Sequence, residues 1–168
     1  VKILTLEIEN DKRARCPKHL KLDIPELCNI SSLCLAGGSY TIRDLPPQIT
    51  SFSLSGPHLS LAESSLLSSL KFLESLECFL PNDTLPSSST LHTLNLRGIK
   101  GETLDLTKYE RLHSLTISFS SIEAMHLTHP ERLKFLEIYD CINIDLSRLS
   151  EFTNLQSLTI RSSITDLN

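Results

Sequence analysis

Apolar residues recur along this chain in a short unit whose first, fourth and sixth positions are apolar. The unit occurs eight times, with starts at Val1, Ile30, Ile49, Leu73, Leu91, Leu112, Leu133 and Leu155. Successive starts lie 18 to 29 residues apart. A repeat with a period of roughly 20 to 50 residues is the sequence signature of solenoids and related architectures. The pattern therefore predicts a solenoid of about eight repeats.

Each unit also has the alternation that is typical of a β-strand. Its last two apolar residues, such as Leu94 and Leu96, are separated by one position and point to the same face of a strand. One strand cannot bury that face alone, but strands stacked about 4.8 Å apart form a parallel sheet over a continuous apolar core. The return segments are too short for long helices. We therefore expect a parallel sheet opposite short helices or irregular segments.

Two return segments carry possible helix starts. The pairs Thr107 with Glu110 and Thr128 with Glu131 have the spacing of a capping box, in which a Thr hydroxyl and a Glu carboxylate satisfy the first helical amides. They predict short helical turns. A longer helix is expected over residues 62–70.

A further apolar position follows the strand in the last four units, at Ile99, Ile122, Ile144 and Ile164. With this addition the whole chain resembles the leucine-rich-repeat family. The resemblance implies an α/β solenoid of about eight repeats, with a curved parallel β-sheet on the concave face. It also implies short helices or irregular segments on the convex face.

The chain departs from the family pattern at the turn after the strand. The asparagine that the family places there is replaced by Ile99, Ser120, Cys141 and Ser163 in the last four units. A serine hydroxyl can partly replace the asparagine amide, so the departure indicates an irregular repeat.

The two ends lack the polar caps that cover the terminal core layers of solenoids. Val1 already lies in a predicted strand, and Asn168 directly follows the apolar Leu167. We therefore expect residues 1–168 to be one leucine-rich-repeat domain, an uncapped fragment of a longer chain.

Composition and charge narrow the range of partners. The chain is 40% hydrophobic and 21% charged, which is typical of soluble globular protein. Its net charge of −4 comes from scattered residues, and the one dense basic cluster lies at residues 12–18. Neither a nucleic-acid partner nor a membrane span is expected.

The five cysteines are odd in number and form no Cys-x-x-Cys pair, so no disulfide framework is indicated. This favours a reducing compartment, cytoplasmic or nuclear. The glycosylation triplets at Asn29 and Asn82 argue weakly for the opposite assignment.

No catalytic motif emerges. Gly37-Gly38 lacks the further residues of a phosphate loop, and no Gly-x-Ser-x-Gly motif is present. We expect no enzymatic activity, no cofactor, no bound metal and no small-molecule substrate. His92 and His113 occupy equivalent positions in consecutive units, which suits either a metal ion or a pH response, or two solvated neighbours.

The outward strand positions form three columns of mostly small, hydroxylated residues. Larger side chains interrupt them at Phe79, Arg97, Phe135, Glu137, Tyr139 and Arg161. Exposed aromatics and arginines are common anchors of protein interfaces, so these residues are the candidate binding site on the concave face. Alternatively, Phe79 with Arg97 and Tyr139 with Arg161 are stacked pairs that only cover the sheet.

Another protein is accordingly the expected partner. The resemblance extends to the substrate-recognition arms of F-box-type ubiquitin ligase subunits and related intracellular regulators. One alternative is a microbial effector or surface protein that binds a host molecule. Another is a structural spacer.

Overall fold

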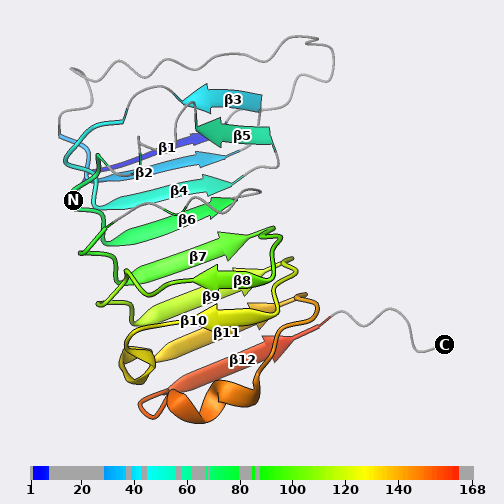
Figure 1. Ribbon diagram of the computed structural model, residues 1–168. Helices are drawn as coiled ribbons and strands as arrows, with labels where there is room; N and C mark the ends of the chain where they lie inside the picture. The colour runs from blue at the N-terminus through cyan, green and yellow to red at the C-terminus, as the bar shows by residue number, and fades with distance from the viewer. Residues whose placement is uncertain are drawn as a thin grey trace.

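The computed structural model describes residues 2–7, 29–36, 39–42, 45–55, 58–61, 67, 69–79, 85 and 88–162, with only the backbone of 6–7, 39–42, 58–61 and 79. These residues form a parallel β-solenoid, with one strand of the main sheet in each rung (Figure 1). The main sheet contains β1 (Ile3–Glu7), β2 (Ser32–Ala36), β4 (Ser51–Ser55), β6 (Ser75–Phe79), β7 (Thr93–Arg97), β9 (Ser114–Ser118), β11 (Phe135–Tyr139) and β12 (Ser157–Arg161).

The strands pair in parallel and without offset, so equivalent repeat positions stack on one another. Leu94 of β7 pairs with Leu115 of β9, and Leu115 pairs with Leu136 of β11. All eight predicted strand units coincide with these strands. The sheet that the alternation predicted is thus confirmed.

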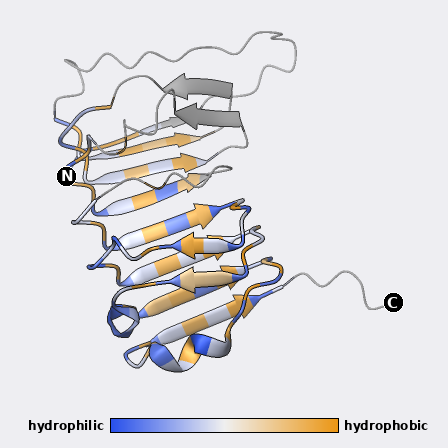
Figure 2. Cartoon of the chain, in the orientation of Figure 1, coloured by the Kyte–Doolittle hydropathy of each residue, from blue (hydrophilic) through white to orange (hydrophobic). Residues whose placement is uncertain are grey.

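The inward side chains form a single aliphatic core. Leu76, Leu94, Leu115 and Leu136 are fully buried in the middle of the sheet. Buried residues alternate with half-buried or exposed ones along β2 and β7. Figure 2 shows the matching alternation of hydrophobic and more hydrophilic residues as bands along the strands. Because each leucine ladder is continuous from rung to rung, the core extends along the solenoid rather than forming a central ball.

A second, shorter layer closes the opposite side of the core. It contains the paired strands β8 (Thr103–Asp105) and β10 (Ala124–His126), and the pair β3 (Ser39–Ile42) and β5 (His58–Leu61). These strands run opposite to the main sheet (Figure 1). Leu104 of β8 faces the core and is buried.

Helix is scarce on this return side of the described rungs. Apart from the single helical residue Leu67, it comprises the 3-10 helices η2 (Pro130–Arg132) and η3 (Ser147–Glu151). The sequence did not predict the paired return strands, and the helix expected over residues 62–70 falls largely outside the described residues. Among the residues described, no helix is both long and apolar enough to cross a membrane.

The two predicted capping boxes are wrong. The amide of Thr107 donates to Oδ1 of Asp105 at 2.9 Å, and no helix follows. The hydroxyl of Thr128 donates to the carbonyl of Thr107 on the preceding rung at 2.7 Å, and η2 has no side-chain cap. Neither threonine caps a helix, although the short helical turn predicted after Thr128 is present as η2. Both threonines stabilise turns and rung stacking.

The turn after the strand is built from the same positions in successive rungs. Gly98, Phe119 and Asp140 all have φ between 51° and 71° and directly follow β7, β9 and β11. Next along the chain, the buried hydroxyl of Ser120 accepts from the amide of Ile99 at 3.1 Å and donates to the carbonyl of Ser118. Serine thus takes over part of the role expected of asparagine.

Candidate functional site

The outer face of the main sheet, the side away from the core, carries the three predicted columns. Pairing links Thr93, Ser114, Phe135 and Ser157 in the first column across β7, β9, β11 and β12. The second column joins Thr116 to Glu137, and the third joins Ser118 to Tyr139. The candidate residues on these strands therefore lie on one face, as the sequence predicted.

Four large side chains occur on consecutive rungs at the carboxyl ends of the strands. The guanidinium carbon of Arg97 lies 5.5 Å from the ring centroid of Phe119, and that of Arg161 lies 6.0 Å from the ring centroid of Tyr139. Both distances are those of cation–π pairs. We call Arg97, Phe119, Tyr139 and Arg161 the aromatic–arginine cluster.

Phe135 and Glu137 extend this cluster along β11. Phe135 is 43% exposed, although its strand is paired on both sides. Glu137 is half-buried, and its carboxylate accepts a hydrogen bond from the Thr116 hydroxyl at 3.2 Å. A similar bond joins Ser53 to Glu77 at 2.9 Å. The two glutamates are therefore fixed by hydroxyls of the preceding rung.

The observed surroundings of the candidate residues agree with the predictions to different degrees. The backbone of Phe79 pairs with Arg97 as predicted, but its side chain lies outside the described residues. Tyr139 and Arg161 stack, as the covering-pair alternative required, yet Arg161 stays exposed. Sequence reasoning missed Phe119, which is 59% exposed, because it falls one position beyond the strand.

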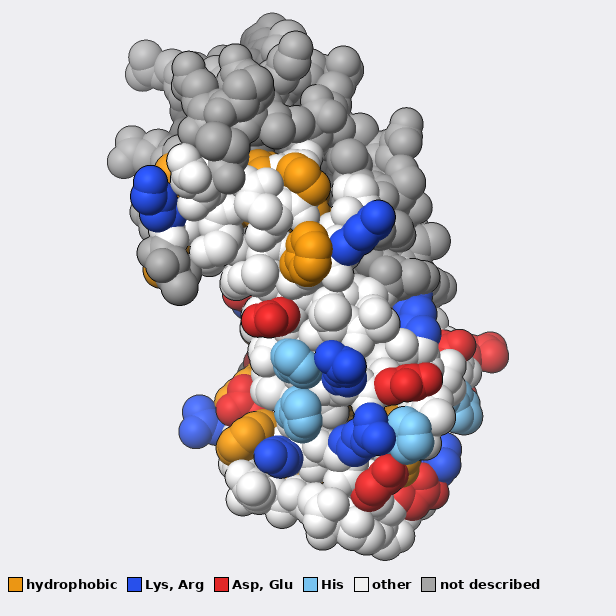
Figure 3. All heavy atoms as spheres, turned by 90° about the vertical axis from the view of Figure 1, so that its left-hand side faces the viewer, with side chains coloured by type: hydrophobic (Ala, Val, Ile, Leu, Met, Phe, Trp, Pro, Cys, Tyr) orange, Lys and Arg blue, Asp and Glu red, His pale blue; other side chains and the backbone are white. Residues whose placement is uncertain are grey.

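A second feature lies at the amino ends of the strands, where the rungs turn into the sheet. Here Lys, Arg and His side chains gather on one face of the solenoid (Figure 3). A hollow of about 570 Å³ opens among them, lined by Arg111, His113, Glu131, Arg132, Lys134, Asn154 and Gln156. Sequence reasoning missed this site. The sequence feature that could have revealed it is an arginine that recurs directly before a buried leucine, at Arg111-Leu112 and Arg132-Leu133.

His92 and His113 are neighbours, as their equivalent positions predicted. Their ring centroids are 5.4 Å apart. Burial lowers the pKa of His113 below its ordinary value, and the charges of His92, Lys134 and Arg132 lower it further. No group of three or more metal-ligating side chains occurs in the part of the chain that the structure describes.

The described cysteines differ in their surroundings. Cys78 is fully buried in the core, and burial together with the nearby charge of Glu77 raises its pKa to about 12. It is therefore a neutral, packed thiol at physiological pH. Cys34 is half-buried and faces outward in the second column. Its pairing with Ser53 places a thiol among the hydroxyls of the outer face.

No protein-family model matches this chain, and searches of the curated proteins and of the solved structures found no significant match.

Proposed function

We propose that this solenoid is an irregular leucine-rich-repeat domain that binds another protein across the outer face of its main sheet. The observation that carries the proposal is the set formed by Phe135 and the aromatic–arginine cluster, in which Phe119, Phe135 and Arg161 are exposed and Arg97 and Tyr139 are half-buried. These side chains project from a surface that is otherwise mostly small and hydroxylated.

The chemistry of this set favours binding over mere coverage of the sheet. Aromatic and arginine side chains are enriched at interface positions where truncation weakens binding most. A stacked arginine such as Arg161 keeps its planar donors available to a partner's carboxylates or carbonyls while its ring neighbour supplies apolar area. The small residues around the set leave room for a partner's backbone to approach.

Within this proposal, the resemblance favours substrate recognition for an F-box-type ubiquitin ligase. The solenoid would then hold the protein to be modified, while the transfer of ubiquitin takes place elsewhere in the assembly. Cells expressing the full-length chain should then show ubiquitination of a captured partner that depends on Phe135 and Tyr139. Capture without dependent ubiquitination would exclude this role but leave protein binding intact.

Quantitative co-purification tests the binding proposal. The triple variant Phe135→Ala, Tyr139→Ala, Arg161→Ala removes large outer-face side chains without touching the core. We expect a defined set of proteins to fall at least about 10-fold in recovery, since interface anchors contribute about 2 kcal/mol or more each.

The matched control is Ile142→Ala, Arg148→Ala. It removes exposed side chains of similar chemistry from other surfaces. This control should recover the same proteins as the wild type, and both variants should melt near the wild-type temperature. Equal recovery by both variants would place binding elsewhere and favour the spacer alternative.

A further inference from the structure

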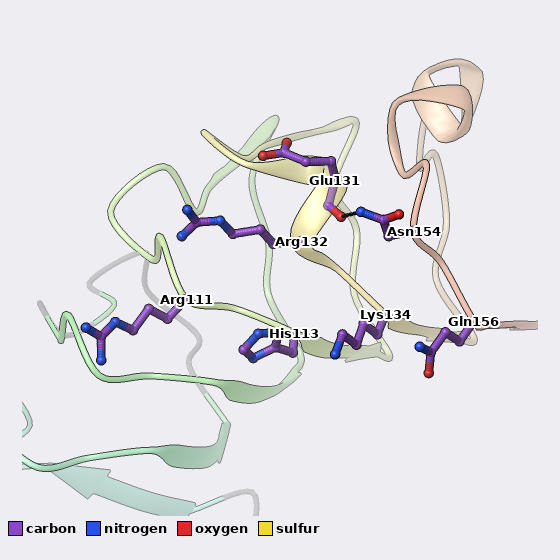
Figure 4. Close-up of a pocket in the computed structure, with 7 residues that line it drawn as sticks. All are labelled: Arg111, His113, Glu131, Arg132, Lys134, Asn154 and Gln156. Atoms are coloured by element: carbon purple, nitrogen blue, oxygen red, sulfur yellow. Dashed lines mark hydrogen bonds between the residues drawn. The ribbon is translucent and has the colours of Figure 1, made fainter.

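The hollow at the amino ends of β9, β11 and β12 is built by the repeat itself. The amide of Lys134 donates to the carbonyl of His113, and the amide of Gln156 donates to the carbonyl of Lys134. These bonds place the three side chains on successive rungs, in one row (Figure 4). Arg111 and Arg132, each two positions earlier, form a second row above them.

The charges of this hollow are unbalanced. Three cationic residues and one carboxylate line it, which leaves a formal charge of +2 with His113 neutral. The Glu131 carboxylate turns away from Lys134 in Figure 4, and Oε1 lies 3.1 Å from Nδ1 of His129. Neither ion pair found among the described residues involves a cation of the hollow.

Arg132 is oriented by the backbone rather than by a partner of opposite charge. One guanidinium nitrogen of Arg132 donates to the carbonyl of Glu110 at 2.8 Å, which orients the side chain and leaves its other donors available. The Asn154 amide donates to the carbonyl of Glu131 at 2.8 Å and fixes the far rim. A hollow with such oriented donors is suited to an anion that accepts several hydrogen bonds.

We propose that this hollow binds a phosphate group, and that its source is a phosphorylated side chain of the protein partner. The dianion of a phosphate monoester matches the formal charge of +2, and its three terminal oxygens can accept hydrogen bonds from the Arg and Lys side chains that line the hollow. A carboxylate would neutralise only half of that charge.

The assignment of the source rests on the proposed function, whereas the anion site does not. Lys134 directly precedes Phe135, so the hollow adjoins the first column of the outer face. A partner segment lying on that column could insert a phosphorylated side chain at its edge. The volume of about 570 Å³ exceeds that of a phosphate alone and leaves room for the side chain that carries it.

His113 provides a local reporter of occupancy. The charged groups that line the hollow around it are Arg111, Arg132, Lys134 and Glu131, with the His92 ring on the adjacent rung. Burial lowers the pKa of His113, and the charges of His92, Lys134 and Arg132 lower it further. A bound dianion favours the imidazolium, so binding should raise the pKa of His113.

The test is an NMR titration of His113 in the whole 168-residue chain, at constant ionic strength, without any partner protein. The probes are inorganic phosphate, a short phosphoserine peptide and the same peptide unphosphorylated. We expect saturable shifts and a raised His113 pKa with both phosphate probes. Affinity should fall about 10-fold in Lys134→Gln and in Arg132→Gln, because each loses a charge-assisted hydrogen bond.

Lys100→Gln is the matched control, since Lys100 is exposed beyond the opposite ends of the strands. It should bind as the wild type does. Shifts that do not saturate, or that are equal in all variants, would overturn the anion site. Tighter binding of the phosphopeptide than of inorganic phosphate supports the partner as the source. Equal binding overturns that assignment alone, and none of these outcomes depends on the outer-face variants.

Discussion

Phe119 has a backbone conformation that is unfavourable for an aromatic residue. Its φ of 51° is a conformation that glycine and asparagine adopt more readily than aromatic residues. The equivalent positions of the neighbouring rungs hold Gly98 and Asp140. A large exposed ring at such a position favours a role in binding rather than in folding.

Replacing Phe119 separates these two roles. Phe119→Asn should leave the free energy of unfolding unchanged or raise it by up to about 1 kcal/mol, because asparagine tolerates a positive φ. The same change should weaken binding at the outer face. Urea denaturation gives the first quantity and co-purification the second. A loss of stability above about 1 kcal/mol would instead make Phe119 a packing residue.

Ser120 is a residue on which two rungs depend. It is buried and joins the amide of Ile99 to the carbonyl of Ser118. Ser120→Ala should lower the free energy of unfolding by about 1 to 3 kcal/mol, since the buried Ile99 amide loses its acceptor. Chemical denaturation measures this loss.

Ser114→Ala is the comparison for Ser120→Ala. Ser114 lies half-buried on the outer face, and its replacement should change stability by about 0.5 kcal/mol or less. Equal effects of the two substitutions would show that the Ser120 hydroxyl contributes little to stability.

At the scale of elements, the stability of the main-sheet strands depends on the rows of inward apolar side chains that stack from rung to rung. Leu115 is fully buried on β9, in the middle of the sheet, with leucines above and below it. Leu115→Ala should therefore destabilise the chain by about 2 to 5 kcal/mol. Thermal and urea unfolding are the measurements.

Leu158 provides the contrast, because it occupies the same repeat position on β12 but is 44% exposed. Leu158→Ala should lower the free energy of unfolding clearly less than Leu115→Ala does. Similar losses of unfolding free energy for Leu158→Ala and Leu115→Ala would contradict a core that is more fully buried in the central rungs than at β12.

The main-sheet strands were predictable because each one repeats the same alternation, and eight copies reinforce one another. The return strands were not. β8 has only Leu104 facing inward between two exposed residues, so three positions contain too little alternation to be recognised. Its strand character comes from pairing with β10 of the next rung, which is a property of stacking rather than of local sequence.

The candidate binding residues on strands were as predictable as the strands themselves, whereas those in turns were not. Positions on the strands, such as Phe135 and Tyr139, follow from the alternation alone. Phe119 and the hollow around Arg132 lie in turns, where the direction of a side chain depends on backbone angles that the pattern does not specify. A comparison of equivalent turn positions between units would have identified Arg111 and Arg132.

On the scale of the whole molecule, stacking converts short units into two long surfaces. The outer face presents side chains at the spacing of adjacent strands, about 4.8 Å, while the amino edge aligns the residues that precede each strand. The exposed aromatic rings of the first surface adjoin the basic hollow of the second at Lys134 and Phe135. One partner segment can therefore contact both.

Site-specific photo-crosslinking tests the binding face most directly. A benzoylphenylalanine at position 135 replaces one exposed aromatic with another, and the same group in place of the exposed Glu102, just before β8, probes the return side. Irradiation of cells expressing each variant should give protein adducts of defined mass from position 135 and none from position 102. Adducts from position 102 alone, or from neither position, would contradict the outer face as the surface that binds a partner.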